Sequence, residues 1–139
     1  MDTIKPTTKD TVLAIDFGTV RIGLAISRYT LAEPLKIIAN DDKMFSNIQE
    51  ICVSENVKKI VVGVSENEMA VLTKKFAGEL EGEIADNWEN KPTIEFMDET
   101  LSSHSVHQKL KTAKKSKRGA DIDHLAAAEF LQEWLEENY

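Results

Sequence analysis

The chain has 139 residues, of which 42% are hydrophobic and 29% charged, and its formal net charge is −7. This length and composition are typical of one folded domain and exclude collagen-like and broadly disordered chains. The longest apolar stretches are far shorter than the roughly 20 residues that span a bilayer. The N-terminus lacks the layout of a secretory signal, and the single cysteine, Cys52, allows no internal disulfide, so we expect a cytoplasmic protein.

The first half of the chain begins with a polar stretch and continues with three β-rich segments. Residues 1–10 include Pro6 and predict a flexible arm, followed by a single domain over residues 11–139. Apolar and β-branched residues then gather at 12–16, 21–27 and 35–39. These segments are too close for a parallel return, which needs a crossover of a dozen or more residues. We therefore predict an antiparallel meander.

The period of the apolar residues changes after residue 40. Residues 44–52 have helical spacing after the candidate caps Asp41 and Asp42, and they precede a continuous apolar strand at 57–64. A second helical stripe at 69–84 precedes a strand at 93–97. Each β-α-β crossover adds a parallel strand to the meander.

The last third of the chain predicts two more helices, a short one at 103–110 and a longer one at 122–136. The expected fold class is therefore α/β. It is a five-stranded mixed sheet in the order 3-2-1-4-5, with strands 1–3 antiparallel, strands 1, 4 and 5 parallel, and helices on its faces. Such sheets place ligands beyond the carboxyl ends of neighbouring parallel strands.

Acidic residues fall at that edge from distant parts of the chain. Asp16 ends the first strand, and Asp98 and Glu99 end the fifth. Asp123 lies in the first turn of the last helix, and counting on from it by helical turns gives the apolar stripe Ala127, Leu131 and Trp134. Because that stripe must face the sheet, we expect Asp123 to face it as well.

Carboxylates gathered in this way repel one another unless a cation lies between them. Oxygen-only ligation favours Mg²⁺ or Mn²⁺, and no cysteine or histidine cluster has the spacing of a zinc site. Such ions stabilise the attacking and leaving oxygens of phosphodiester cleavage, so the pattern predicts a metal-dependent nuclease. Each acid alone also suits a simpler role, as a turn former or as a partner of a helix dipole.

The same residues carry a family resemblance. The run LAIDFGT at 13–19, continued by RIGLA at 21–25, resembles the opening motif of the YqgF-like family. This family is described as Holliday-junction-resolvase-like and as nucleases proposed to process pre-16S ribosomal RNA. Further matches follow in the same order: AEPL at 32–35, IVVG at 60–63, DE at 98–99, LS at 101–102, and Asp123 followed by AAA at 126–128 and Leu131.

The resemblance implies a ribonuclease H-like fold and a hydrolase that uses Mg²⁺ or Mn²⁺. It assigns the catalytic and metal-binding acids to Asp16, Glu99 and Asp123, with Asp98 as a secondary acid. It also places Thr19 and Arg21 beside the site, where they would position a phosphate. The implied partner is nucleic acid, either precursor ribosomal RNA or branched DNA, with the ribosome as a further candidate. Whether the protein is a monomer or a homodimer stays open.

The sequence departs from the family pattern around these acids. Val20 replaces a basic residue, Thr100 replaces an arginine, and Glu66 and Glu68 fall where a Leu-Pro loop is usual. These changes keep a second function open, that of a catalytically weak nucleic-acid-binding or ribosome-associated module. A third is an actin-like nucleotide-binding protein, since the DFGT run at 16–19 also resembles a phosphate-binding turn. The chain has room for only one of the two domains that such proteins close over a nucleotide.

A basic segment precedes the last helix. Between residues 109 and 118 there are six basic residues and no acidic residue: Lys109, Lys111, Lys114, Lys115, Lys117 and Arg118. Such a segment would hold a nucleic-acid backbone in a salt-dependent manner without reading its bases. A solvated loop is the alternative. We expect Cys52, Trp88 and Trp134 to be packing residues.

Overall fold

The computed structural model describes residues 10–64, 68–98 and 123–138. Their elements are β1 (Thr11–Asp16), β2 (Arg21–Arg28), β3 (Leu31–Ala39), α1 (Met44–Ser54), β4 (Val57–Val64), α2 (Glu68–Asn87), β5 (Thr93–Asp98) and α5 (Asp123–Asn138). Most of the predicted N-terminal arm, the helix predicted at 103–110 and the basic segment lie outside the described residues. The same holds for Glu66, Glu99 and Thr100.

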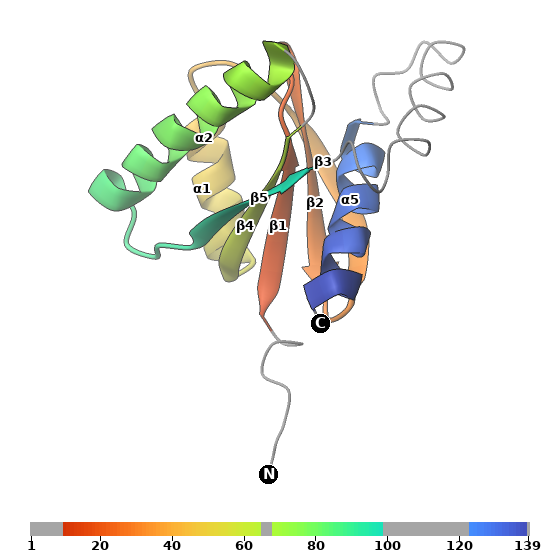
Figure 1. The fold of residues 1–139 in the computed structure, drawn as a ribbon. Helices are drawn as coiled ribbons and strands as arrows, with labels where there is room; N and C mark the ends of the chain where they lie inside the picture. The colour runs from red at the N-terminus through yellow and green to blue at the C-terminus, as the bar shows by residue number, and fades with distance from the viewer. Residues whose placement is uncertain (1–9, 65–67, 99–122, 139) are drawn as a thin grey trace.

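The five strands form one mixed sheet in the order β3-β2-β1-β4-β5. β2 pairs antiparallel with both β1 and β3, while β4 pairs parallel with both β1 and β5. This order and these directions confirm the predicted α/β sheet. Helices α1 and α2 cover one face of the sheet and α5 covers the other (Figure 1).

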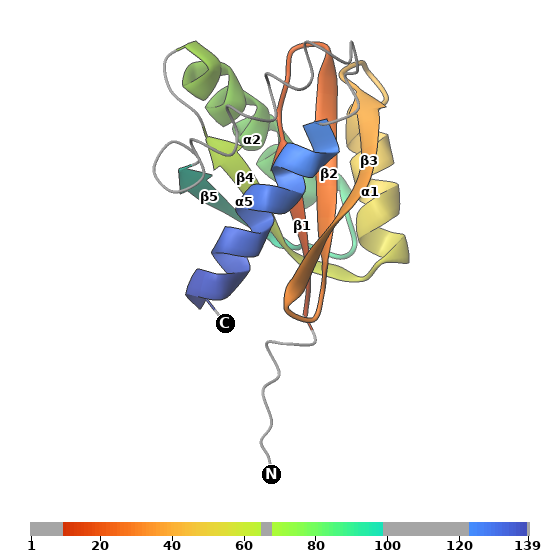
Figure 2. The ribbon, with the colours of Figure 1, turned by 90° about the vertical axis from the view of Figure 1, so that its right-hand side faces the viewer.

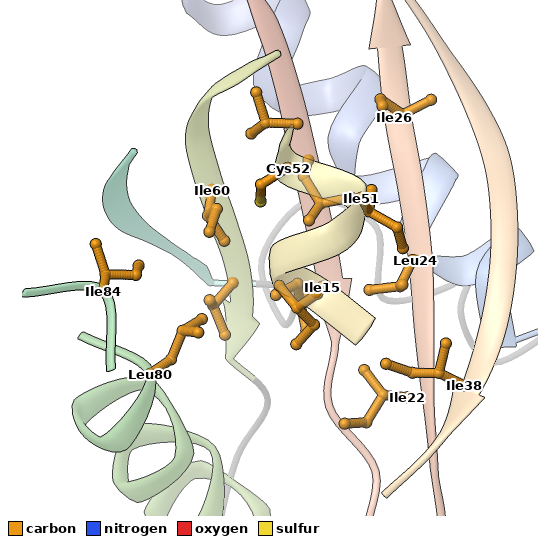
Figure 3. Close-up of a cluster of buried hydrophobic side chains, with 14 of the residues drawn as sticks. Ile15, Ile22, Leu24, Ile26, Ile38, Ile51, Cys52, Ile60, Leu80 and Ile84 are labelled. Atoms are coloured by element: carbon orange, nitrogen blue, oxygen red, sulfur yellow. The ribbon is translucent and has the colours of Figure 1, made fainter. Parts of the chain in front are cut away.

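The central strand β1 is buried on both faces. Leu13 and Ile15 pack into the cluster beneath α1 and α2, whereas Val12 and Ala14 pack into the cluster beneath α5. Figure 3 shows the first cluster, in which Ile15 lies among side chains from the neighbouring strands and helices. Strict alternation along β1 therefore gives Asp16 the same side of the sheet as Ala14, the side that α5 covers.

Helix α5 packs through the predicted stripe. Ala127 and Leu131 have no exposed surface and Trp134 is 5% exposed. The helix crosses the sheet diagonally, from its start near the end of β1 toward the opposite end of the sheet (Figure 2). The apolar period predicted this face correctly, because only a helix with that phase buries all three side chains.

Two side chains of α5, Gln132 and Trp134, fix the helix to the sheet through hydrogen bonds. Gln132 accepts a hydrogen bond from the Ala32 amide at 2.9 Å and donates one to the Thr30 carbonyl at 3.1 Å, which ties the helix to the β2–β3 hairpin. The Trp134 indole donates to Glu95 of β5 at 3.1 Å. Helix α5 is thus held at both edges of the sheet.

Two expectations for local structure were wrong. β3 begins at Leu31 rather than after Pro34, because the pairing with β2 shifts register between Leu24 and Ala25. Proline is tolerated at such irregularities and on edge strands, where its missing amide breaks no ladder bond. The N-cap of α1 is Lys43, with no side-chain cap, and the Asp41 carboxylate instead accepts from the Lys43 amide at 3.0 Å.

The predicted packing residues are confirmed. Cys52 is 1% exposed and Trp88 4%. Burial raises the pKa of the Cys52 thiol to about 12, because the apolar surroundings disfavour the thiolate. Among the described residues, no helix has the length and apolar character needed to cross a membrane.

Ser27→Ala tests a buried hydrogen bond between β1 and β2. The Ser27 hydroxyl accepts from the Val12 amide at 2.8 Å, at the point where the β1–β4 register shifts. Removing it leaves a buried amide unpaired, so we expect a loss of about 1–3 kcal/mol in the free energy of unfolding, measured by urea denaturation. Ser46→Ala on the exposed surface of α1 is the control and should change it by less than about 0.5 kcal/mol. Equal effects would contradict the assignment.

Glu95→Gln tests the anchor between α5 and β5 through its pH dependence. The hydrogen bond from Lys59 holds the pKa of the Glu95 carboxyl below its usual range. Such a carboxylate stabilises the fold above its unfolded pKa of about 4.3, and this contribution is lost as the pH falls through the folded value. Because the pair is partly exposed, we expect a deficit of about 0.5 kcal/mol at pH 7 that closes toward pH 3.

Glu129→Gln, on the exposed face of α5, is the control for Glu95→Gln in β5. Chemical denaturation of both variants at a series of pH values gives the comparison. A deficit in Glu95→Gln that stays constant from pH 7 to pH 3 would mean that the charge of Glu95 contributes nothing.

Candidate active site

Asp16 lies at the carboxyl end of the central strand. It pairs with Gly23 of β2, and the residue before it, Ile15, pairs with Val62 of β4. Its side chain is half-buried. The next residue, Phe17, stacks on Phe76 of α2, on the opposite face of the sheet. Alternation along β1 directs Asp16 to the other face, the one covered by α5.

Asp98 ends β5 at the same end of the sheet but has the opposite direction. It pairs with Val64 and directly follows Met97, which packs into the cluster beneath α5. Alternation therefore directs Asp98 to the face of α1 and α2. The structure therefore brings Asp16 and Asp98 to one edge of the sheet, and alternation assigns them to different faces.

Helix α5 begins at Asp123, and both ribbon views place its start at the end of the sheet where β1 finishes (Figures 1 and 2). Glu99 and the side chain of Asp123 lie outside the described residues. Within the ranges that are described, no three acidic, histidine or cysteine side chains form a group that could hold a metal ion. Of the three predicted catalytic acids, the structure therefore describes Asp16 in full and only the backbone of Asp123.

The turn of residues 17–20, which joins β1 to β2, lies beside Asp16 and is tightly constrained. Asn40 donates from its backbone amide to the Val20 carbonyl at 2.9 Å and from its side-chain amide to the Gly18 carbonyl at 2.8 Å. A Cβ atom on Gly18 would lie 2.3 Å from the Arg21 carbonyl oxygen, a distance that no side chain tolerates. Glycine is therefore required in the turn that joins the antiparallel strands β1 and β2.

An aromatic stack fixes the start of this turn. The rings of Phe17 and Phe76 lie 4.7 Å apart with an interplanar angle of 28°, and Phe45 of α1 stacks on Phe76 at 6.0 Å. Three elements thus contribute one ring each. The predicted phosphate-binding residues Thr19 and Arg21 are both exposed, and they lie two and four residues after Phe17 in the sequence.

Sequence reasoning missed Asn40 and the aromatic stack. Phe45 and Phe76 belonged to predicted helical stripes, but nothing in their spacing showed that Phe17 would join them. Asn40 belongs to no predicted motif, and in the sequence it lies between the predicted strand at 35–39 and the candidate caps Asp41 and Asp42. No sequence signal identified it, because its partners follow from the pairing of β3 with β2.

Solved structures share this fold. T. thermophilus RuvC in complex with Holliday junction substrate matches with a TM-score of 0.58 and 14% identity, over 92% of this chain and 94% of that one. The Fowlpox virus resolvase bound to Holliday junction DNA matches with a TM-score of 0.55 and 10% identity, over 91% and 97%. The fold is therefore that of the ribonuclease H-like resolvases, as predicted.

Family membership follows from the sequence comparison. The model of the RuvX family, described as Holliday junction resolvase, matches residues 10–137, and the chain belongs to this family. A Sulfurihydrogenibium relative is 34% identical over 90% of this chain and 89% of its own length. A Maridesulfovibrio salexigens relative is 38% identical over 89% and 96%. Both are named "Putative pre-16S rRNA nuclease", which confirms the resemblance seen in the motifs.

Gly18→Ala and Gly78→Ala form a matched pair that tests the constraint on the 17–20 turn. The first would force a backbone shift and should lower the free energy of unfolding by about 1–3 kcal/mol. The second adds a methyl group in open space within α2 and should raise it by about 0.5–1 kcal/mol. Thermal or urea denaturation measures both. A Gly18→Ala variant as stable as wild type would show that the turn is looser than described.

Proposed function

We propose that the protein is a metal-dependent endonuclease that cleaves structured nucleic acid, either precursor 16S ribosomal RNA or branched DNA. The observation that carries this is the position of Asp16. Its carboxylate ends the central strand, is directed to the face of α5 and lies at the end of the sheet where α5 begins with Asp123. Membership of the RuvX family and the names of the relatives support the same activity.

We assign the catalytic and metal-binding acids to Asp16, Glu99 and Asp123. Asp98 directly follows Met97, so alternation along β5 directs it to the face of α1 and α2. Glu99 is the next residue in the sequence, and the family motif assigns the acid of this segment to it. Asp98 is therefore a neighbour of the site rather than a member.

The donor set fits a hard divalent cation. The assigned residues offer carboxylate oxygens alone, and these are the ligands that Mg²⁺ and Mn²⁺ prefer. When bound, such an ion supplies positive charge and Lewis acidity at the scissile phosphate. The carboxylate of Asp16 would hold that charge in place, because a strand buried on both faces leaves its end little freedom to move.

The 17–20 turn and the basic segment would bind the substrate backbone. Thr19 offers a hydroxyl group and Arg21 a guanidinium group at the turn, both exposed beside Asp16. Along the chain before Asp123, the cationic residues would hold further phosphates: Lys111, Lys114, Lys115, Lys117 and Arg118. Binding would then weaken steeply with salt and show little dependence on base sequence.

The paired variants Asp16→Asn and Asp98→Asn test this function. Purified protein is incubated with a branched DNA and with an RNA containing the precursor end of 16S ribosomal RNA, each with Mg²⁺ or Mn²⁺ and with EDTA. We expect cleavage of one substrate that requires the metal. Asp16→Asn should lower the rate at least about 100-fold by removing a metal ligand, and Asp98→Asn less than tenfold because its side chain has the other direction.

Three results would contradict the proposal. They are cleavage that persists in EDTA, cleavage that survives Asp16→Asn, and salt-sensitive binding of either substrate without turnover under any metal condition. The last result would favour the nucleic-acid-binding module. Light scattering during the same experiments distinguishes a monomer from a homodimer, and symmetric paired cuts in a junction would call for the latter.

A further inference from the structure

We propose that Asn40 is a positioning residue of the active site, which holds the 17–20 turn in the conformation that presents Thr19 beside Asp16. This inference rests on the proposed function and deepens it, since it assigns a role in the same site to a residue in no recognised motif. Asn40 lies outside the strands and directly after β3, 24 positions after Asp16 in the sequence.

The geometry of Asn40 is unusual because one residue binds both sides of Thr19. Its backbone amide donates to the Val20 carbonyl at 2.9 Å and its side-chain amide donates to the Gly18 carbonyl at 2.8 Å. The two acceptors flank Thr19 in the sequence. A single residue therefore holds the Gly18–Thr19 peptide group, directly before the proposed phosphate ligand, and the Val20–Arg21 peptide group, one residue beyond it.

The register of the sheet explains why Asn40 reaches this position. Arg21 pairs with Ala39, so Asn40 and Val20 are the next opposed positions beyond the end of the β2–β3 ladder. The bond from the Asn40 amide to Val20 continues the ladder by one step. Beyond it the two chains diverge, and the side-chain amide spans the extra distance to Gly18.

The rest of the turn has little freedom to compensate for a loss of Asn40. Phe17 is held by the stack on Phe76, and Gly18 has no space for a side chain beside the Arg21 carbonyl. Thr19 and Val20 are exposed and are the part of the turn with which a substrate would make contact. Small displacements of such groups are expensive, because catalysis depends on reacting groups held within fractions of an ångström.

A purely structural role is the alternative, and a matched control separates the two. Asn138 also donates from its side-chain amide to a backbone carbonyl, that of Trp134 at 2.9 Å, although Asn138 itself is exposed whereas Asn40 is half-buried. It lies in the last turn of α5, the end of that helix remote from Asp123. Asn138→Ala removes a bond of the same kind far from Asp16, so we expect only Asn40→Ala to affect the reaction, and the melting temperature of each variant measures what its bond contributes to stability.

The kinetic test combines Asn40→Ala with Thr19→Ala in the full-length protein. We expect Asn40→Ala to lower kcat/KM about tenfold and Asn138→Ala to leave it within twofold. Thr19→Ala should also lower it, and the double variant should be no worse than Thr19→Ala within about threefold, because Asn40 acts through Thr19. Multiplicative losses, no loss in Thr19→Ala, or equal losses in Asn40→Ala and Asn138→Ala would overturn the proposal.

Hydrogen–deuterium exchange tests the turn without reference to activity. A peptide covering residues 17–21 should exchange faster in Asn40→Ala than in wild type, and at the wild-type rate in Asn138→Ala. Unchanged exchange in Asn40→Ala would overturn the role of Asn40 even if the enzyme is active. Faster exchange together with a wild-type protein that cleaves neither substrate would instead overturn the proposed function, and with it the role of the turn in catalysis.

Discussion

The burial of β1 on both faces is the constraint on which the rest of the structure depends. Four consecutive residues of this strand, Val12 to Ile15, have no exposed surface. Each must match the core on its own side, so a slip of one residue would move all four to the wrong cluster. The register of the central strand is therefore strongly determined. The same register fixes the position of Asp16 at the end of the strand.

This constraint also explains why the arrangement at the end of the sheet differs on its two sides. On the α5 side, β1 ends in a carboxylate and Met97 of β5 is buried. On the side of α1 and α2, the chain leaves β1 through an aromatic ring packed between helices. Asp16 therefore lies on one side of this edge and the stack of Phe17 on Phe76 on the other.

Much of the fold could be predicted from the sequence because its signals are periodic and local. The short separations between the first three strands excluded parallel pairing, and the helical stripes gave the two crossovers that place β4 and β5. The start of β3 could not be predicted, since Pro34 is normally excluded from strands and its tolerance depends on a register shift opposite Ala25. The predicted N-cap of α1 was also wrong, because the Asp41 carboxylate accepts a hydrogen bond from the Lys43 amide in the turn before the helix.

The candidate site was predictable to the extent that it depends on strand ends. The position of Asp16 followed from its place after an apolar run, and alternation along β5 directs Asp98 to the face of α1 and α2. Asn40 could not be found in this way, because its two acceptors are backbone carbonyls and carry no residue-specific signature. Which carbonyls an asparagine meets is decided by pairing between strands, and that is known only once the register is known.

The burial of Cys52 has a practical consequence for studies of this protein. Its thiol is 1% exposed and, with a pKa of about 12, remains protonated at neutral pH. Alkylating reagents and oxidants attack the thiolate, so the native chain should be almost inert toward them. A cysteine introduced at the exposed tip of the β1–β2 hairpin, for example at Val20, would then be the sole reactive position. It would accept a fluorophore or a cross-linker to a nucleic-acid backbone without prior removal of the natural thiol.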